Sequence, residues 1–542
     1  MIKELLKNDI KRVVSDLGID EVPDFKVEIP PEEFGDYSTN VAFLLTKKLR
    51  KSPKMIAEEL SGRFSELEYV LKVTVAGPGF INFVLNDSIY RKSLFHIVDN
   101  PRFWEKEGDT LIQFEFGSAN PTGPYTIGHG RQLIFGDVLC NVFQARGYRV
   151  HREMYINDAG RQIKLLGRSL WVRYNELFGK EYELPEDGYR GEYLIDLAEE
   201  LKISYGDRFV DRWDSEIEEF FKSYAVGKIM EGMKESLERL GMSFDNYFSE
   251  KSLVDDGSVE EILRKFDEMG LTYRKDGALW FAVSKFVDDD DKVLVRSDGT
   301  YTYFLTDIAY HYNKYKRGYR RAYDIWGADH MGHIPRMRAA MKALGIADDF
   351  LYFIIHQYVN IKRGGEVIKM STRKGQFSTL DELVESVGKD ATRYFFAMFD
   401  PDTHMLFDID LAKKKNNENP VFYVQYAHAR IASIFRTASQ RGMKLDTRIP
   451  EVLMNEEEKR LIKQLGNFPE ILDQITEDYK TNRLTNYLES LAGAFHAFYN
   501  KHVVVDADSP ELSMFRLTLC KAVKNVLSDG LSLIGVSAPE SM

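Results

Sequence analysis

A loop rich in glycine and proline, residues 117–128, separates a strand-like run from a helix-like run. Residues 111–116 are mostly apolar and of strand length, and from His129 onward apolar residues recur at helical spacing. Free N–H groups and the dipole at a helix N-terminus attract phosphate, and Gly128 and Gly130 would let a flat ring approach the backbone. An ordinary strand-to-helix turn is the alternative, and the loop and helix alone favour neither interpretation.

A second segment, residues 369–375, offers cations in a short polar loop. It reads KMSTRKG, and its cations are Lys369, Arg373 and Lys374. Cations on a mobile loop beside glycine suit a pyrophosphate leaving group, because negative charge develops on that group in the transition state. A Lys-Met-Ser triplet is a weak signal by itself.

Together the two segments resemble the two signatures of class I aminoacyl-tRNA synthetases. The run SANPTGPYTIGHGR resembles the HIGH signature in the version of the bacterial arginyl-tRNA synthetase family, and KMSTR resembles the KMSKS signature about 240 residues later. The helical pattern SVGKDATRYFF follows the second signature. Two departures occur. Thr126 stands where the family usually has its first histidine, and Thr372 stands where it usually has its second lysine.

The resemblance extends over the whole chain. GDYSTNVA and AGPGFINF resemble the N-terminal domain of that family, YRGEYLIDLA its insertion within the nucleotide fold, and NNENPVFYVQYAHARIASIFR its anticodon-binding helical domain. The implied fold class is α/β: a Rossmann-like parallel-sheet catalytic domain with an N-terminal α/β domain and a C-terminal all-α helical-bundle domain. We expect these domains at 1–105, 106–399 and 400–542, with the helical insertion at about 165–240.

The resemblance implies a ligase that activates L-arginine with ATP and transfers it to the 3′-terminal adenosine of arginine tRNA, releasing AMP and pyrophosphate. Positioning and electrostatic stabilisation suffice for both steps. The implied catalytic residues are His129 at the α-phosphate and Lys369, Arg373 and Lys374 at the leaving pyrophosphate. The implied ATP-binding residues are Pro121, Gly123, Thr126, Gly128, His129, Gly130, Gly327, Asp329, His330, Met370 and Ser371.

An arginine pocket needs carboxylates for the guanidinium fork and an aromatic ring that packs against it. Strands 293–296 and 301–306 are expected to form a hairpin that leads into a helix, so that Tyr303 and Asp307 point into one pocket. Without the resemblance, a helix cap would be the preferred interpretation of Asp307. The implied arginine-binding residues are Glu115, Ser118, Asn120, Glu250, Tyr303 and Asp307. Lysine in such a site would leave carboxylate oxygens unpaired.

His330 and His333 could form a metal pair, but no third ligand is spaced for zinc. The resemblance instead places this segment near the adenine and ribose. We therefore expect ATP with Mg²⁺ as the cofactor and no tightly bound protein metal. The implied tRNA contacts are Phe80, Asn82, Phe83, Tyr499 and Met542, and packing within the protein is an equal alternative for the last three.

The bulk composition sets limits on the class of protein. A chain of 542 residues is too long for one hydrophobic core. No apolar run approaches the ~18 residues of a membrane span, and the N-terminal run lacks the apolar core of a signal peptide. Cys140 and Cys520 lie outside any metal-ligand spacing, which suits a reducing cytoplasm. The net charge of −12 means that RNA would have to be bound by local clusters of basic residues.

The expected partners are arginine tRNA, L-arginine and ATP, with no membrane and no obligate protein partner, and we expect a monomer. Two alternatives stay open. One is a non-catalytic tRNA-binding protein on this scaffold, because both signatures are altered at Thr126 and Thr372. The other is an enzyme of the same class that charges a different amino acid. The matching arginine pocket argues against the first, and the acidic pocket and N-terminal domain argue against the second.

Overall fold

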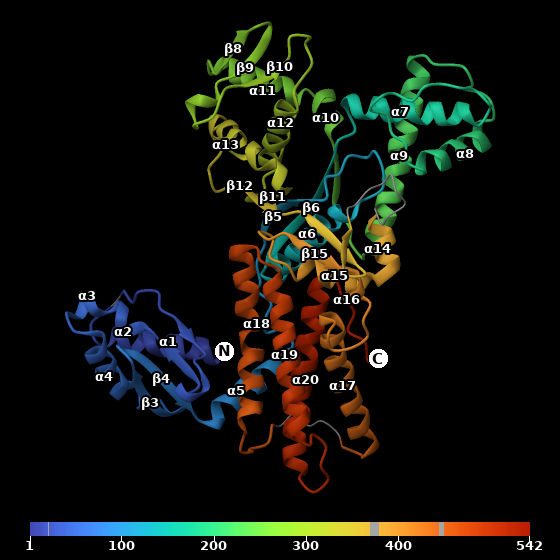
Figure 1. The fold of residues 1–542 in the computed structure, drawn as a ribbon. Coiled ribbons are helices and arrows are strands. Elements are labelled where there is room, and N and C mark those ends of the chain that lie inside the picture. Colours follow the sequence, from blue (N-terminus) through green and yellow to red (C-terminus); the bar gives the residue numbers. More distant parts are fainter. Residues whose placement is uncertain (20, 369–378, 444–448) are drawn as a thin grey trace.

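The computed structural model describes all residues except 20, 369–378 and 444–448. A parallel sheet lies at the centre of the molecule. Two lobes stand above it, a helical bundle lies below it, and the N-terminal lobe lies beside the bundle (Figure 1). In the described part of the chain, no helix is long and apolar enough to cross a membrane.

The central sheet has five parallel strands in the order β12-β11-β5-β6-β7. They are β5 (Thr110–Glu115), β6 (Tyr148–Ile156), β7 (Asn246–Ser249), β11 (Arg321–Gly327) and β12 (Leu351–His356). From β5 the chain builds the sheet in one direction through β6 and β7, and it then returns to the other side of β5 at β11. The boundary between β5 and β11 is therefore the switch point where open α/β sheets bind ligands beyond the carboxyl ends of their strands. This confirms the predicted Rossmann-like catalytic fold.

Helix α6 (Ile127–Ala145) follows the glycine-rich loop and begins two residues before the predicted start at His129. Thr126 is its N-cap, and the Thr126 backbone N–H donates to the His129 Nδ1 atom at 3.0 Å. The predicted helical period is confirmed, because Leu133, Ile134 and Val138 are fully buried.

The lobe inserted between β6 and β7 is helical. It contains α7 (Gly160–Glu176), α8 (Tyr193–Tyr205) and α9 (Ser215–Arg239). These helices enclose an aromatic core that includes Trp171, Tyr174, Phe209 and Phe221. These aromatic contacts hold the three helices together, and their buried side chains are continuous with the hydrophobic core around the central sheet.

The second lobe is inserted between β7 and β11 and carries a small antiparallel sheet in the order β10-β9-β8. Its elements are α10 (Glu250–Asp255), α11 (Ser258–Glu268), β8 (Thr272–Lys275), β9 (Ala278–Phe281), η2 (Val283–Lys285), β10 (Lys292–Val295) and α12 (Tyr303–Lys316). After β11 come η3 (Ala328–His333) and α13 (Ile334–Ala343), which lead to β12.

The predicted strand 301–306 is wrong. It is reduced to a single bridge at Tyr301, and β10 pairs with β9 instead. The Thr302 side chain caps helix α12, so the chain is already helical at Tyr303. Tyr303 and Asp307 are consequently one helical turn apart, on the same face of α12.

The segment that follows β12 forms the small sheet β14-β13-β15 and several short helices. These elements are β13 (Val359–Arg363), β14 (Glu366–Ile368), α14 (Leu380–Val387), α15 (Lys389–Ala397), β15 (Met405–Asp408) and α16 (Ile409–Ala412). The C-terminal bundle consists of α17 (Pro420–Gln440), α18 (Glu456–Asp478), α19 (Asn482–Lys501) and α20 (Pro510–Ile534). This confirms the predicted all-α C-terminal part.

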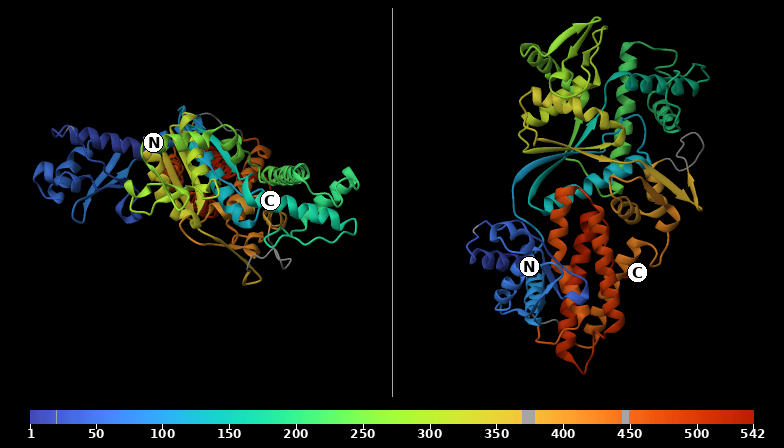
Figure 2. Two further views of the ribbon diagram at one scale, coloured as in Figure 1. Left: turned by 90° about the horizontal axis from the view of Figure 1, so that it is seen from above. Right: turned by 60° about the vertical axis from the view of Figure 1, so that its left-hand side comes forward.

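The N-terminal lobe combines an antiparallel sheet, in the order β1-β2-β4-β3, with helices. Its elements are α1 (Ile2–Ser15), β1 (Val27–Glu28), η1 (Glu32–Phe34), β2 (Tyr37–Thr39), α2 (Val41–Leu44), α3 (Thr46–Leu49), α4 (Pro53–Phe64), β3 (Val70–Ala76), β4 (Phe80–Leu85) and α5 (Asp87–Asp99). Figure 2 shows this lobe beside the bundle. A buried ion pair between Lys463 and Asp36, at 2.7 Å, joins the two parts.

A buried guanidinium connects helix α6 to the bundle. Arg393 of α15 is fully buried and forms an ion pair with Asp137 of α6. It also donates to the carbonyl oxygens of Ile534 at 2.6 Å and Leu240 at 3.0 Å. One side chain therefore fixes the C-terminal ends of α9 and α20 relative to the middle of α6.

Replacing Arg393 should destabilise the protein severely. Arg393→Ala removes the nearer of two guanidinium groups from the Asp137 carboxylate, leaving Arg152 at 3.6 Å, and it leaves two carbonyls without a donor. We therefore expect a loss of about 3 kcal/mol or more in the free energy of unfolding, measured by urea unfolding. Arg12→Ala is the control, because the Arg12 side chain is 63% exposed and pairs with Asp9 on the same helix. The control should leave the midpoint unchanged, and equal midpoints for both variants would contradict the role of Arg393.

Candidate active site

A cavity of about 1010 Å³ lies at the carboxyl ends of the central strands. The predicted ATP set and the predicted arginine set meet in its walls. The predicted residues that line it are Glu115, Ser118, Asn120, Thr126, Gly128, His129, Glu250, Tyr303, Asp307, Gly327, Asp329 and His330. The sequence thus predicted a substantial minority of the lining, from segments that lie more than 200 residues apart.

Three predicted ATP contacts do not line this cavity. Pro121 is buried, and Gly123 lies against the ring of Tyr193. A Cβ atom at Gly130 would come within 2.7 Å of the Leu380 side chain, so glycine at that position lets α14 pack against α6. The small size of Gly130 is therefore explained by helix packing.

The second signature lies outside the described residues. This applies to Lys369, Met370, Ser371, Thr372, Arg373 and Lys374. The residues that follow it are described and lie beside the first signature. The Leu380 N–H donates to the Tyr125 carbonyl at 2.9 Å, and Thr379 forms a bridge with Thr126.

His129 is held in one protonation state by the helix start. Its Nδ1 atom accepts the Thr126 N–H, and the Thr126 hydroxyl lies 3.1 Å from the same nitrogen. Burial lowers the pKa of His129. The ring is therefore neutral with its proton on Nε2, and that N–H is available as a donor in the cavity wall. Thr126, which replaces the usual histidine, serves this arrangement as the N-cap.

A carboxyl group on the opposite wall lacks a full set of partners. Glu250 is 5% exposed, and its Oε1 atom accepts from the Thr306 hydroxyl at 3.0 Å. Its Oε2 atom and the Tyr155 hydroxyl are buried, and neither makes a well-formed hydrogen bond among the described residues, although the phenol lies near enough to the carboxyl group to lower its pKa slightly. Burial raises the pKa of Glu250 to about 7, and the negative charge of Asp307 adds to the shift. Buried polar atoms without partners in a cavity wall indicate a place for a ligand.

Asp307 is part of a chain of polar side chains. Its Oδ2 atom lies 2.8 Å from His333 Nε2, and His333 Nδ1 accepts from Arg336 Nε at 2.7 Å. His333 therefore faces the carboxylate of α12, while the His330 side chain is 60% exposed and lies beside Asp329. The two histidines point to different partners, which does not support the metal pair considered above.

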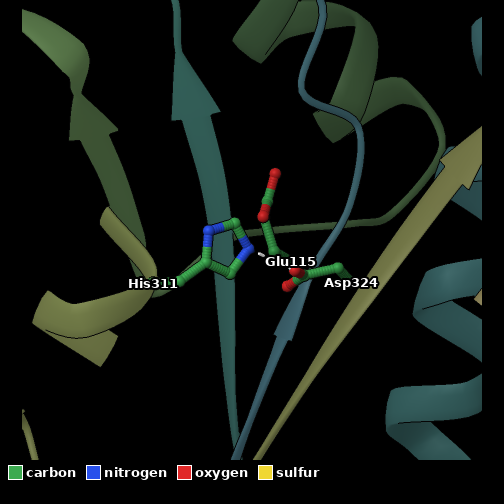
Figure 3. Close-up of side chains that lie close together, drawn as sticks. All are labelled: Glu115, His311 and Asp324. Atoms are coloured by element: carbon green, nitrogen blue, oxygen red, sulfur yellow. Dashed lines mark hydrogen bonds and ion pairs between the residues drawn. The ribbon is translucent and has the colours of Figure 1, made fainter. Parts of the chain in front are cut away.

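Three buried ionisable side chains, Glu115, His311 and Asp324, lie close together where the cavity meets the central sheet (Figure 3), and the first two line the cavity. Glu115, His311 and Asp324 lie close enough together to hold a metal ion. The Lys314 ammonium already sits between the two carboxylates, 2.9 Å from Glu115 and 2.5 Å from Asp324, and His311 Nε2 lies 2.5 Å from Asp324. Burial raises the pKa of Glu115, whereas Lys314 and His311 overcome the effect of burial and lower the pKa of Asp324. These residues form an ion-pair network in which lysine supplies the charge of a cation.

Sequence reasoning missed several residues of the site. Tyr155 stands near the carboxyl end of β6 and His356 at that of β12, and both line the cavity. Polar side chains at the ends of parallel strands were the signal that could have found them. Arg131 carried no such signal. Its buried guanidinium donates to two carbonyl oxygens, those of Gln357 and Asp400, each at 2.8 Å. In the sequence, Gln357 precedes the second signature and Asp400 follows it.

The predicted tRNA contacts differ in exposure. Phe80 is 44% exposed, whereas Asn82 and Phe83 are buried, and Phe83 packs edge-on against Phe64 in the core. The packing alternative therefore holds for Phe83. Tyr499 and Met542 are exposed and line a second cavity of about 610 Å³ in the bundle. The Arg430 guanidinium lies 4.9 Å from the centre of the Tyr499 ring in that cavity.

Comparisons with known proteins match the full length of the chain. The family described as "Arginyl tRNA synthetase N terminal domain" matches residues 2–85, "tRNA synthetases class I (R), catalytic domain" matches 100–427, and "DALR anticodon binding domain" matches 424–542. The arginine–tRNA ligase of Thermotoga maritima is 56% identical over 100% of both chains. That of Bacillus subtilis is 44% identical over 100% of this chain and 99% of its own. The arginyl-tRNA synthetase structure of Thermus thermophilus shares the fold, with 23% identity, a TM-score of 0.75 and 100% of both chains covered.

The raised pKa of Glu250 predicts that a guanidinium ligand binds more tightly as pH rises. Below pH 7 the carboxyl group is protonated and neutral, and above pH 7 it is ionised and can pair with the guanidinium. The dissociation constant of L-arginine, measured by equilibrium dialysis, should therefore fall about tenfold between pH 6 and pH 8. Glu250→Gln should bind weakly with no such pH dependence. A wild-type dissociation constant that is flat over this range would rule out ionisation of Glu250 as the cause.

Proposed function

The chain belongs to the arginyl-tRNA synthetase family, and we infer that it is an arginine–tRNA ligase. It activates L-arginine with ATP to arginyl-adenylate, releases pyrophosphate, and transfers the arginyl group to the 3′-terminal adenosine of arginine tRNA. Identity of 44% or more to curated ligases along the full chain supports this activity.

One observation carries the assignment of substrate to site. The cavity places Glu250 Oε2 and the Tyr155 hydroxyl, both buried and without partners among the described residues, on one wall and the His129 N–H donor on another. A guanidinium group brings five N–H donors in a planar fork, which can satisfy carboxylate and phenol oxygens together. We assign the arginine side chain to Glu250, Asp307 and Tyr303, and its α-amino and carboxylate end to Glu115, Ser118 and Asn120.

Activation in this site is a matter of placement and electrostatics. The arginine carboxylate attacks the α-phosphate of ATP, and the pyrophosphate leaves with the electron pair of the broken P–O bond. The neutral His129 donates its Nε2–H to the phosphate, and the N-terminus of α6 adds the positive end of its dipole. Because His129 is neutral, it stabilises the developing charge by hydrogen bonding and keeps its proton through the step.

The rest of the ATP site extends to the second signature and to β11. We assign the adenine and ribose side to Gly327, Asp329 and His330, and the leaving pyrophosphate to Lys369, Arg373 and Lys374. Mg²⁺ accompanies ATP in this proposal as the ion of the nucleotide. The link between Leu380 and Tyr125, at 2.9 Å, supports a common site for both signatures, because it holds the residues after the second signature beside the first.

Transfer requires the 3′ end of the tRNA to reach the same cavity. We assign the outer contacts with the tRNA to Phe80 in the N-terminal lobe and to the bundle cavity with Tyr499, Met542 and Arg430. Exposed aromatic and arginine side chains suit unpaired bases, which stack on such surfaces. The match of residues 424–542 to an anticodon-binding domain supports the assignment of the bundle cavity.

Compartment and assembly complete the proposal. Both cysteines are buried and free, and burial raises the pKa of both thiols, which fits a chain that forms no disulfide. We place the protein in the cytoplasm as a monomer.

ATP–pyrophosphate exchange tests the function. Wild-type protein with L-arginine and arginine tRNA should exchange label between pyrophosphate and ATP, and lysine in place of arginine should not support exchange. Asp307→Ala should lose exchange while keeping the wild-type unfolding midpoint, because it removes one carboxylate of the guanidinium site.

The same assay separates the remaining alternatives. Bound tRNA without exchange under any condition would indicate a non-catalytic tRNA-binding protein. Exchange with a different amino acid would indicate another specificity within the same class of enzyme.

A further inference from the structure

The helical insertion contacts the first signature loop through one side chain. Tyr193, the first residue of α8, donates its hydroxyl hydrogen to the carbonyl oxygen of Thr122, and its ring packs against Gly123. Burial raises the pKa of this phenol, so the hydroxyl remains a donor at neutral pH. Thr122 and Gly123 belong to the loop that delivers Thr126 and His129 to the cavity.

The local sequence is built to place this ring. A Cβ atom at Gly191 would lie 2.3 Å from Cε1 of Tyr193, so any side chain at position 191 would displace the ring. Gly191 has no positive φ, so its backbone conformation does not require glycine. Glycine at position 191 is therefore explained by the close approach of the Tyr193 ring.

A second anchor joins the same insertion to the other side of the site. Near the end of α9, Ser236 donates its hydroxyl hydrogen to Asp381 of α14 at 2.7 Å, and Arg239 lies 3.5 Å from the same carboxylate. Asp381 follows Leu380, whose N–H bonds to Tyr125. The two anchors of the insertion thus end on the two backbone segments that meet at Tyr125 and Thr126.

We propose that the helical insertion positions the ATP-binding loops, and that Tyr193 is the positioning residue for the first of them. Aromatic contacts hold the helices of the insertion together, and its buried side chains continue into the core of the central sheet, so it acts as a support for the two anchors. Tyr193 fixes the position of the loop through its hydrogen bond to Thr122, and Ser236 fixes the position of α14 through its hydrogen bond to Asp381. The proposal concerns binding of ATP, because the two anchors end on the backbone segments that meet at Tyr125 and Thr126, beside His129. Ser118 and Asn120 share the loop with Thr122, but Glu250 and Asp307, which are assigned to the guanidinium, lie on α10 and α12. It rests on the function proposed above.

Two variants disturb the contact by independent means. Tyr193→Phe removes the hydroxyl and keeps the ring, and Gly191→Ala displaces the ring and keeps the hydroxyl. Tyr182→Phe is the matched control, because the Tyr182 hydroxyl bonds within the insertion, to Asp211 at 2.8 Å. All three are to be compared with the wild type in ATP–pyrophosphate exchange with arginine tRNA present, after their unfolding midpoints have been measured.

We expect the variants to change the KM for ATP and to leave the KM for arginine almost unchanged. Tyr193→Phe and Gly191→Ala should each raise the KM for ATP about fivefold, the size expected for the loss of one neutral hydrogen bond. The KM for arginine should stay within about twofold of wild type, and Tyr182→Phe should leave both values unchanged. This split distinguishes positioning of ATP from a general loss of structure, which would move both values together.

Two results would overturn the proposal. One is a KM for ATP in Tyr193→Phe and Gly191→Ala no higher than in Tyr182→Phe. The other is an equal rise for ATP and arginine in either variant. If the proposed function itself is wrong, the wild-type chain shows no ATP–pyrophosphate exchange. The proposed role of Tyr193 is then wrong as well, because it depends on that function.

Discussion

Helix α12 is held on the central sheet by buried charge, and the geometry of the site depends on this attachment. One face of the helix carries Tyr310, His311, Lys314 and the following Arg317, all directed at carboxylates on three adjacent strands. Lys314 pairs with Glu115 of β5 and Asp324 of β11, and Tyr310 and Arg317 bond to Glu153 of β6. An unpaired buried charge is strongly unfavourable, so each pair permits a single placement of the helix. The first turns of α12, which carry Tyr303 and Asp307, are thereby fixed at the cavity.

Glu250 differs from these carboxylates, because it lacks a cationic partner among the described residues. Its Oε2 atom is buried without a partner among the described residues, and burial raises its pKa to about 7. The protein thus supplies cations to the carboxylates that hold the fold together, whereas the Glu250 carboxyl group in the cavity wall has no cation of its own within the part of the chain that the structure describes. A guanidinium replaces the missing partner, whereas a neutral ligand of the same shape would leave the charged form of Glu250 buried and unpaired. Discrimination among ligands follows from this difference in pairing.

Much of the fold was predictable from local patterns in the sequence. The buried run of β5 and the helical spacing after His129 predicted the strand and helix of the first signature, and both are present. Residues 300–306, TYTYFLT, alternate like a strand, but Thr302 caps a helix that begins at Tyr303. Periodicity alone does not decide between a strand and a helix in so short a run. The domain limits at 105 and 399 stay predictions.

The site was predictable where a resemblance named residue types, and less so where it depends on long-range pairing. Glu115 and Lys314 are 199 positions apart, and no local pattern in either segment predicts their contact. The partner of His333 proved to be Asp307 on another helix, which a search for metal spacing within one segment could not find. Arg131 bonds to backbone carbonyls, which carry no sequence signal at all.

The most direct test of the central claim is the number of protons released when L-arginine binds. Isothermal titration at pH 7, in two buffers of different ionisation enthalpy, measures this number. If Glu250 has a pKa of about 7 in the free protein and pairs with the guanidinium in the complex, wild type should release about half a proton per arginine and Glu250→Gln should release none. Arginine binding without proton release by the wild type would contradict the claim that Glu250 waits, unpaired, for the substrate cation.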